Sequence, residues 1–334
     1  MIYLRSFEIP KDCWVDEYFN RSGWDAEDLP DDMPMVSQNT HLNTWYPWNT
    51  FYLRGLHNFD FEDITILYGG NGSGKTTLLN VIAQHLRLNR LTRYNRSTCF
   101  DDYVSVCRYS AEDLEAMQCI QRGKILVSDD VFDAMLRKRE KNEYIDQRRE
   151  ELATEHHQRR NSSYPRHNLT DPHVYEEFKR TIAAKRTSCS GFIKANLQRN
   201  IQEQSNGETA FNFFVESIPE NALVLLDEPE NSLSAKWQME LVKFITGAVR
   251  AFRCQFIIAT HSPFVLSIPG ARIYDLDSYP IKSERWYNLE NVRSYYELFK
   301  DQRGAATCST SHSGQVVKVG FGLQTVGTQG PCSS

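Results

Sequence analysis

The sequence predicts an α/β fold in which helices cover both faces of a parallel sheet and a helical insertion interrupts the core. Three features of the chain support this fold class. The β-rich run 64–68 leads into a glycine-rich stretch, and an apolar helical pattern follows from Thr76 to Leu88. Two later apolar runs, Ala222–Leu226 and Gln255–Ala259, are typical of buried strands, and a helical pattern separates them. The 334 residues are enough for roughly two domains and a sizeable core.

The first part of the predicted core covers residues 1–91. Its start, Ile2–Ile9, alternates in polarity and is rich in β-formers, which predicts an opening strand. Residues 10–50 differ in character, because eight acidic and only two basic residues lie between Pro10 and Met35 and four tryptophans lie in the wider stretch. We interpret residues 10–50 as a loop-rich acidic insertion that is held in place by its aromatic side chains.

Residues 92–200 form a second, mostly helical insertion with a basic composition. The range 137–200 contains fifteen Lys or Arg against nine Asp or Glu. Apolar residues recur at steps of four or seven over 174–201, which predicts one face of a long helix. We expect two helices, Asp130–Leu152 and Asp171–Ile201, with a polar link between them. The positive charge is explained either by a solvated helical face or by contact with the phosphates of a nucleic acid.

The core resumes at residues 201–303, and a low-complexity tail occupies residues 304–334. Gly, Ser, Thr, Gln and Cys dominate the tail, and no charged residue follows Lys318. This composition indicates a segment that is disordered or that does not belong to the native protein.

The composition of the chain excludes several classes of protein. The longest uninterrupted apolar run, Ala222–Leu226, is far shorter than the ~20 residues that a membrane helix needs, and no secretory signal is visible. The eight cysteines include no C-x-x-C pair, so the familiar zinc-finger spacings are absent and a reducing cytoplasm is the expected location. A net charge of −5 argues against a uniformly basic nucleic-acid-binding protein.

The most specific motif is the glycine-rich run between the predicted strand 64–68 and the helix that follows. It satisfies G-x-x-x-x-G-K-[ST], the pattern of a phosphate-binding loop. Glycines let consecutive backbone N–H groups surround an anion, and the positive end of the helix points at the same place. In this pattern Lys75 reaches the β- and γ-phosphates, and the Thr76 hydroxyl binds Mg²⁺. The predicted phosphate-binding residues are Gly69, Gly70, Asn71, Gly72, Ser73, Gly74, Lys75, Thr76 and Thr77.

Two acidic residues, Asp227 and Glu228, directly follow the apolar run Ala222–Leu226. Open α/β sheets place ligand-facing groups at the carboxyl ends of their strands. Asp227 can therefore bind Mg²⁺, and Glu228 can accept a proton from a water that attacks the γ-phosphate. His261 ends the next predicted strand. A lone histidine is more often structural, but this position predicts a contact with the γ-phosphate.

Four motifs follow one another along the chain: the glycine-rich run, Ser205-Asn206-Gly207-Glu208, Leu226–Asn231 and Thr260–Pro263. Their order and spacing resemble the ABC-type ATPase domain in its non-transporter branch. That branch includes the structural-maintenance-of-chromosomes (SMC), RecF-like and overcoming-lysogenization-defect ATPases and the bacterial antiphage-defence ATPases. Its members are often labelled AAA family ATPases. The resemblance covers the chain up to the tail, and it implies a P-loop NTPase fold with an ABC-ATPase-like sheet.

The resemblance also implies a role for each matching residue. Lys75 and Thr76 match the Walker A lysine and the Mg²⁺-binding hydroxyl. Asp227 matches the Walker B aspartate, Glu228 the catalytic glutamate and His261 the switch histidine. The family pattern therefore implies an ATPase that uses Mg²⁺ to hydrolyse ATP to ADP and phosphate.

Ser205 and Gly207 resemble the signature motif, which in this family acts on ATP held by a second subunit. The run Gln204–Glu208 departs from the transporter sequence Leu-Ser-Gly-Gly-Gln, and this departure favours the non-transporter branch. The resemblance thus implies a homodimer that forms around ATP.

Two assignments and the partner stay open. The residue of the Q-loop lies among Gln118, Gln121 and the turn 128–130, and the aromatic residue that stacks on adenine lies among Tyr46, Trp48 and Tyr52. The expected partner is DNA, or a nuclease or toxin protein, in DNA repair, chromosome maintenance or phage defence, with no membrane partner. The alternative function is the ATP-binding subunit of an ABC transporter, which the long charged insertion and the Asn-Gly-Glu signature disfavour.

Overall fold

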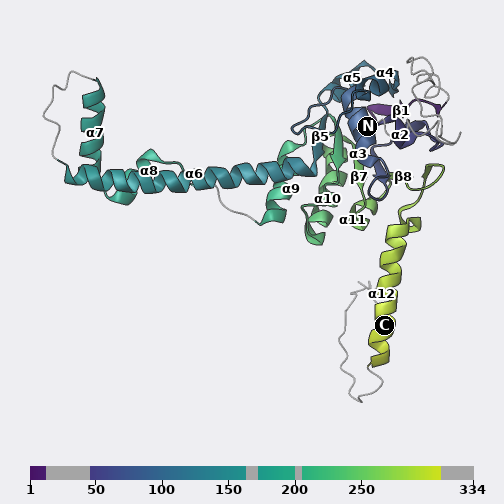
Figure 1. Ribbon diagram of the computed structural model, residues 1–334. Helices are drawn as coiled ribbons and strands as arrows, with labels where there is room; N and C mark the ends of the chain where they lie inside the picture. Colours follow the sequence, from purple (N-terminus) through teal and green to yellow (C-terminus); the bar gives the residue numbers. More distant parts are fainter. Residues whose placement is uncertain (13–45, 163–171, 200–204, 310–334) are drawn as a thin grey trace, which may run out of the picture. The chain divides into compact units, whose positions relative to one another are not determined.

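The computed structural model describes residues 1–12, 46–162, 172–199 and 205–309 (Figure 1). The chain divides into two compact units, Met1–Trp286 and Tyr287–Ser334. In the described part of the first unit, a six-stranded sheet has the order β5-β6-β7-β3-β8-β9, and a three-stranded sheet has the order β2-β1-β4. Helices alternate with the strands of the larger sheet. The predicted α/β fold class is therefore confirmed.

The larger sheet is parallel except at its last strand. Strands β5, β6, β7, β3 and β8 run in one direction, and β9 pairs antiparallel with β8. Every residue of β3, β6 and β7 is buried, as expected for a parallel sheet that is covered on both faces. The bounds are β5 Lys124–Val127, β6 Leu223–Asp227, β7 Gln255–Thr260, β3 Ile64–Tyr68, β8 Arg272–Asp275 and β9 Lys282–Ser283.

The register of this sheet brings three strand ends to one edge. Tyr68 of β3 lies beside Thr260 of β7, and Asp227 of β6 lies beside Ala259 of β7. The chain leaves all three strands at this level, so the glycine-rich run, His261 and Glu228 emerge side by side. One strand, β7, separates the strand of the glycine-rich run from the strand of the two acids.

Helices pack against the sheet through apolar side chains. Helix α3 (Lys75–His85) contacts β6 and β7, and its Leu78 and Leu79 join Leu225 and Ile257 in one buried cluster. Because successive side chains of a strand point to opposite faces, the intervening residues of β6 and β7 face away from α3. Helix α10 (Ala235–Ala251) also contacts β7, and it buries Leu241, Ile245 and Ala248. Two shorter helices, α9 (Asn206–Ser217) and α11 (Pro263–Leu266), contact α10.

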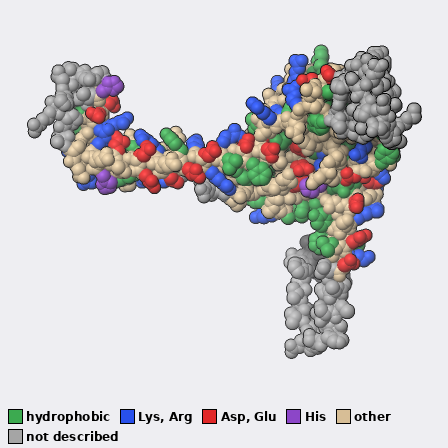
Figure 2. Space-filling model, in the orientation of Figure 1, with side chains coloured by type: hydrophobic (Ala, Val, Ile, Leu, Met, Phe, Trp, Pro, Cys, Tyr) green, Lys and Arg blue, Asp and Glu red, His purple; other side chains and the backbone are tan. Residues whose placement is uncertain are grey.

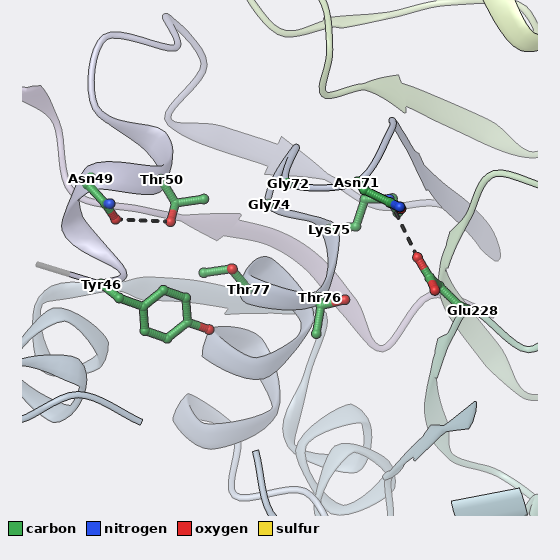
Figure 3. Close-up of a pocket in the computed structure, with 10 residues that line it drawn as sticks. All are labelled: Tyr46, Asn49, Thr50, Asn71, Gly72, Gly74, Lys75, Thr76, Thr77 and Glu228. Atoms are coloured by element: carbon green, nitrogen blue, oxygen red, sulfur yellow. Dashed lines mark hydrogen bonds and ion pairs between the residues drawn. The ribbon is translucent and has the colours of Figure 1, made fainter. Parts of the chain in front are cut away.

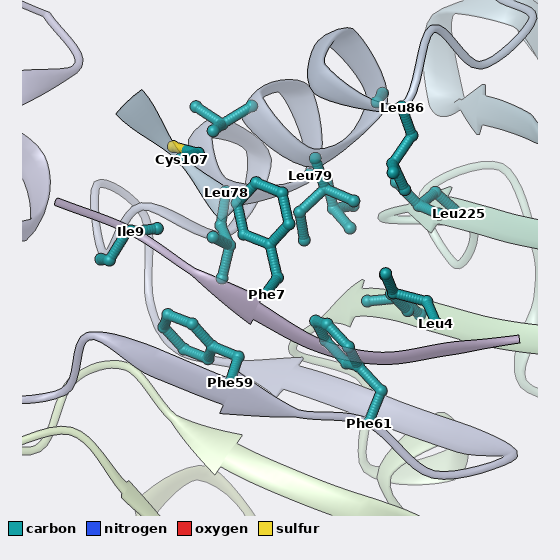
Figure 4. Packing of buried hydrophobic residues seen from close by; sticks show 14 of the residues in the cluster. Leu4, Phe7, Ile9, Phe59, Phe61, Leu78, Leu79, Leu86, Cys107 and Leu225 are labelled. Carbon is teal, nitrogen blue, oxygen red and sulfur yellow. The ribbon is translucent and has the colours of Figure 1, made fainter. Parts of the chain in front are cut away.

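The small antiparallel sheet covers the remaining apolar residues of the core. Its strands are β1 (Leu4–Glu8), β2 (Asn58–Asp60) and β4 (Arg108–Ala111). Figure 4 shows Phe7 and Phe59 of this sheet packed in the same cluster as Leu78 of α3. The short helices α2 (Trp48–Phe51), α4 (Phe100–Val106) and α5 (Leu114–Gln121) add buried residues to the cluster.

A single buried amide joins the two sheets. Gln255, the first residue of β7, is fully buried, and its Oε1 accepts hydrogen bonds from the backbone N–H groups of Tyr3 and Leu4, both at 2.9 Å. Its Nε2 donates to the carbonyls of Leu4 at 2.9 Å and Glu62 at 3.1 Å. Gln255 thus satisfies four backbone groups between β1, β7 and the residues that precede β3.

Replacing Gln255 by leucine is expected to lower the free energy of unfolding by about 3 kcal/mol or more, because buried backbone groups left without a partner cost about 1–3 kcal/mol each. Denaturant unfolding of Gln255→Leu and wild type measures the difference. The matched control is Gln121→Leu at an exposed position of α5. Equal unfolding midpoints for Gln255→Leu and the control would contradict this role.

The range 92–200 is not all helical, because it contains β4 of the small sheet and β5 of the core sheet. The helices that follow β5 are also divided differently from the expectation. Helix α6 (Ser128–Asn161) is longer than expected and contacts α7 (Pro172–Arg186), α8 (Cys189–Asn196) and α9. The prediction of one helix over Asp171–Ile201 is wrong. Ser188 has an extended backbone and its side chain accepts from the N–H of Gly191, so a new helix begins there.

Several expectations concern residues that the structure describes only in part. Most of the acidic segment 10–50 and most of the tail lie outside the described residues. In the second unit, helix α12 (Glu290–Ser309) passes the expected boundary at 303. A short 3₁₀ helix, η4 (Trp286–Asn288), begins at the last residue of the first unit. None of the described helices combines the length and apolar character of a membrane span.

Candidate functional site

The glycine-rich run 69–76 joins β3 to α3 and borders a cavity of about 420 Å³ (Figure 3). The cavity is formed by this run with the start of α3, by the segment around α2 and by the residue that follows β6. Its lining residues are Tyr46, Asn49, Thr50, Asn71, Gly72, Gly74, Lys75, Thr76, Thr77 and Glu228. The phosphate-binding pattern and one of the two acids therefore share one cavity.

Two glycines in this loop have a backbone that other residues rarely adopt. Gly72 has φ +84° and Gly74 has φ +99°, both in the left-handed region. A Cβ on Gly74 would also lie 2.6 Å from Thr50 Cγ2. The curvature of the loop thus requires glycine at these places, and it leaves room for a ligand against the backbone.

Lys75, the first residue of α3, points into the loop rather than into solvent. Its side chain is only 4% exposed, and Nζ donates to the carbonyl oxygens of Gly69 and Gly70, both at 2.8 Å. Nζ also lies 3.7 Å from Glu228 Oε1. Nearby, the buried Ser73 Oγ has no hydrogen-bond partner among the described residues. A buried amine and a buried hydroxyl in a glycine loop suit a ligand that is rich in anionic oxygen atoms.

Thr76 and Asp227 bring two oxygen ligands together. Thr76 Oγ1 donates to Asp227 Oδ1 at 3.0 Å. Burial raises the pKa of Asp227 to about 6, and the neighbouring Glu228 carboxylate acts in the same direction, whereas the Thr76 hydrogen bond and the Lys75 charge oppose the shift. Hydroxyl and carboxylate oxygens are ligands that Mg²⁺ prefers, so this pair fits the expected metal.

Glu228 is held in an unusual backbone conformation beside the loop. Its φ of +46° lies in the left-handed region, which costs energy for a residue with a Cβ and is typical of functional sites. The Nδ2 of Asn231 donates to Glu228 Oε2 at 2.9 Å, while Oε1 faces Lys75. Figure 3 shows Glu228 and Tyr46 on opposite sides of the cavity. The carboxylate is therefore fixed at the wall of the cavity.

His261 belongs to the same group of side chains. It follows β7, and its Nδ1 lies 3.9 Å from Glu228 Oε1 and 3.4 Å from Glu230 Oε1. About half of its side chain is exposed. The structure thus brings together Lys75, Asp227, Glu228 and His261, although they are spread over almost two hundred residues of the chain.

The two signature residues lie elsewhere, at the start of α9. Ser205 is the N-cap of this helix and its side chain accepts from the N–H of Glu208 at 3.2 Å. A Cβ on Gly207 would lie 2.7 Å from Trp237 of α10, so glycine permits close packing of the two helices. Arg139 of α6 donates to Asn206 Oδ1 at 3.2 Å. Neither Ser205 nor Gly207 lines the cavity.

The three aromatic candidates for adenine stacking have different surroundings. Tyr46 lines the cavity, and its ring stacks on Phe100 with the ring centroids 5.8 Å apart. Trp48 is buried in the core against Tyr103, and Tyr52 packs against the same core. Of these three residues, Tyr46 alone is placed to meet a ligand.

The candidates for the Q-loop residue also lie in different parts of the structure. Gln118 and Gln121 are exposed on α5, away from the edge of the sheet that carries Asp227. Residues 128–130, expected as a turn, are the first residues of α6 and directly follow β5. Strand β5 pairs with β6 so that Val127 lies beside Asp227. Asp130 is fully buried and its Oδ2 accepts from the N–H of Val127 at 2.9 Å.

Sequence reasoning assigned no role to two charged residues of this region. Glu230 lies in the Asp-Glu-Pro-Glu run, and only the run itself could have marked it. The half-buried Arg90 donates to Asn80 Oδ1 at 2.6 Å and lies over the ring of Tyr94, and its charge acts to lower the pKa of Asp227. No motif in the sequence points to Arg90.

Comparisons with known proteins agree with this geometry. Residues 65–171 match the family model described as "ATPase family associated with various cellular activities (AAA)". Residues 195–267 match the model described as "AAA domain, putative AbiEii toxin, Type IV TA system". No curated protein matches the chain.

Similar solved structures include the Smc head domain with an extended coiled coil bound to the C-terminal domain of ScpA from Pyrococcus furiosus. It is 13% identical, with 74% of this chain and 95% of that chain covered and a TM-score of 0.34. A dimeric, post-hydrolysis state of the ATP-binding cassette MJ0796 bound to ADP and Pi is 16% identical. In that case 69% of this chain and 88% of the other are covered, with a TM-score of 0.31.

A parallel sheet, a glycine loop between β3 and α3 and an acidic pair after β6 define a P-loop nucleotide-binding protein. Within this class, the chain carries AAA-family ATPase domains. The resemblance is thereby confirmed at the level of AAA-family ATPase domains.

Proposed function

We propose that the protein is a Mg²⁺-dependent ATPase that hydrolyses ATP to ADP and phosphate. The observation that carries the proposal is the contact of Thr76 Oγ1 with Asp227 Oδ1 in the immediate surroundings of the Lys75–Glu228 pair. The proposed metal-binding pair, the proposed cation for phosphate and the proposed carboxylate base are thus close together, which supports the proposal. Phosphoryl transfer to water needs these three elements and little else from a protein.

Several residues in and beside the cavity have a proposed task. The glycine-rich loop and Lys75 bind the phosphates, and Tyr46 stacks on the base. Glu228 takes a proton from the attacking water, and His261 contacts the γ-phosphate. Because Asn231 and Lys75 hold the two oxygens of Glu228, its carboxylate is oriented before the substrate arrives.

Mg²⁺ is the proposed metal, with Thr76 and Asp227 as its protein ligands. When bound, it neutralises charge on the β- and γ-phosphates. The burial that raises the pKa of Asp227 favours a bound cation, since a metal compensates the charge of a carboxylate that is otherwise removed from water.

We propose that a second copy of the chain completes the site. Ser205 and Gly207 do not line the cavity of their own chain, and Glu208 places a negative charge at the positive end of α9. In a two-fold dimer, each signature turn would contact the ATP bound by the other copy. Hydrolysis removes the γ-phosphate that both copies hold, so the dimer is expected to separate.

The proposed role is in DNA repair or maintenance or in phage defence, with DNA or a nuclease or toxin protein as partner. The family description that names a toxin supports a toxin protein as the partner. The helical insertion supports DNA less, because three arginines of α6 pair with acids on the same helix. Figure 2 shows positive and negative side chains interspersed along α6. Three such pairs are Arg148–Glu151, Arg149–Asp146 and Arg159–Glu155.

We also propose a cytoplasmic location. The five cysteines within the described side chains carry free thiols, which is compatible with a reducing compartment. They are Cys99, Cys107, Cys119, Cys189 and Cys254.

Phosphate release from ATP by the purified protein tests the proposed function. Turnover is expected with Mg²⁺, to disappear with EDTA and to return when Mg²⁺ is restored. Turnover that is insensitive to EDTA would contradict the metal site, and absence of ATP binding would contradict the ATPase. Duplex DNA added to the same assay distinguishes the two candidate partners. Stimulation of turnover by DNA that weakens as the salt concentration rises supports DNA as the partner. Unchanged turnover supports a protein partner.

A further inference from the structure

Glu230 is a buried carboxylate that joins two strand ends beside the proposed nucleotide site. It lies three residues after Asp227 and is only 5% exposed. Its Oε1 accepts from Thr260 Oγ1 at 2.5 Å, from the N–H of His261 at 3.0 Å and from the N–H of Ser262 at 3.2 Å. A carboxylate from the segment after β6 therefore holds the backbone that follows β7.

The same oxygen faces the imidazole of His261. Nδ1 lies 3.4 Å from Glu230 Oε1, nearer than the 3.9 Å to Glu228 Oε1. A carboxylate next to one ring nitrogen keeps the proton on that nitrogen and fixes the orientation of the ring. The proton is thus expected on Nδ1.

A second contact fixes the neighbouring backbone. Gln238 of α10 accepts from Ser262 Oγ at 2.7 Å and donates to the carbonyl of Leu233 at 2.9 Å. Glu230 and Gln238 together tie the loop after β6 to the turn after β7. Glu230 holds this turn through two backbone N–H groups, and Gln238 holds it through the Ser262 hydroxyl. Burial of a carboxylate is costly, and Glu230 Oε2 has no hydrogen-bond partner among the described residues.

We propose that Glu230 is a positioning residue for ATP hydrolysis, which sets the ring orientation and the protonated nitrogen of His261. The inference rests on the proposed function, because it assumes that His261 acts on the γ-phosphate. Glu230 itself does not line the cavity. It acts through His261, so its effect should vanish when the imidazole is absent.

The test compares Glu230→Gln, His261→Ala and the double variant. The matched control is Glu240→Gln, at a partly exposed side chain of α10. Glu230→Gln keeps an acceptor oxygen for Thr260 and the two N–H groups, but it removes the charge that faces Nδ1. We expect Glu230→Gln to lower kcat about tenfold or more, with little change in KM and in melting temperature. The double variant should turn over within about twofold of His261→Ala, because residues that act as a unit are not additive.

Each outcome is decisive. Wild-type turnover by Glu230→Gln, or multiplied losses in the double variant, would overturn the positioning role while His261→Ala remained impaired. Full turnover by His261→Ala would instead contradict the proposed role of His261. A fall in melting temperature that accounts for the lost activity of Glu230→Gln would reduce Glu230 to a structural residue. ATP binding, measured by calorimetry in EDTA, checks that each variant keeps a folded site.

Discussion

Replacing Lys75 by alanine is expected to abolish ATP turnover and to weaken ATP binding at least about 100-fold, since charge-assisted hydrogen bonds to phosphate are among the strong ones. The Lys75 amine is buried at the centre of the loop, where Gly69 and Gly70 accept from it. Without it, the loop offers backbone N–H groups but no positive charge to the β- and γ-phosphates. Glu228, 3.7 Å away, would also lose its cationic neighbour and add repulsion.

Titration calorimetry with ATP and an assay of phosphate release measure the two effects of Lys75→Ala. Lys243→Ala is the matched control, because this lysine is exposed on α10 and pairs only locally with Glu240. Circular dichroism verifies that both variants are folded. ATP affinity of Lys75→Ala equal to that of wild type would contradict the assignment of the cavity as a phosphate site.

Replacing Glu228 by glutamine is expected to lower turnover by about 10²–10⁴, the usual contribution of a general base, while ATP remains bound. Glutamine has the size of glutamate and can still accept from Asn231 Nδ2, so the wall of the cavity keeps its shape. It cannot take a proton from water. ATP that is bound but not hydrolysed should therefore accumulate, and with it the proposed dimer.

Sedimentation of Glu228→Gln with saturating Mg²⁺ and ATP measures the dimer, and phosphate release measures turnover. Wild type and Glu240→Gln serve as controls, and both should dimerise only transiently. A Glu228→Gln variant that stays monomeric while calorimetry shows bound ATP would contradict the proposed ATP-dependent dimer. Such a result would leave the ATPase proposal intact.

Much of the fold and of the site could be predicted because the strands are short, apolar and bounded by distinctive residues. The run Ala222–Leu226 predicted a buried strand, and the parallel register then places Asp227 at the edge where the glycine loop begins. Local chemistry alone thus fixed which residues meet at this edge. Predicting the meeting of Thr76 and Asp227 needed only strand–loop–helix order and the rule for strand ends.

The remaining features depend on contacts that no local pattern encodes. The helix expected over Asp171–Ile201 breaks at Ser188, because the side chain of this serine caps a new helix. The apolar periodicity of the sequence continues across the break, so it does not indicate where the first helix ends. Arg90 contacts Asn80 and Tyr94 through tertiary packing. Glu230 is separated from His261 by thirty-one residues, and only the adjacency of β6 and β7 brings the two together.

The hydrogen bond from Arg139 to Asn206 links α6 to the first turn of α9. Helix α6 starts directly after β5, the strand beside β6. The Asp130 carboxylate accepts a hydrogen bond from the N–H of Val127 at this junction. The 34 residues of α6 span about 50 Å at about 1.5 Å per residue. A displacement of the far end of α6 would therefore move Ser205 and Gly207 at the start of α9. Closure of a dimer around nucleotide would, in return, swing that far end.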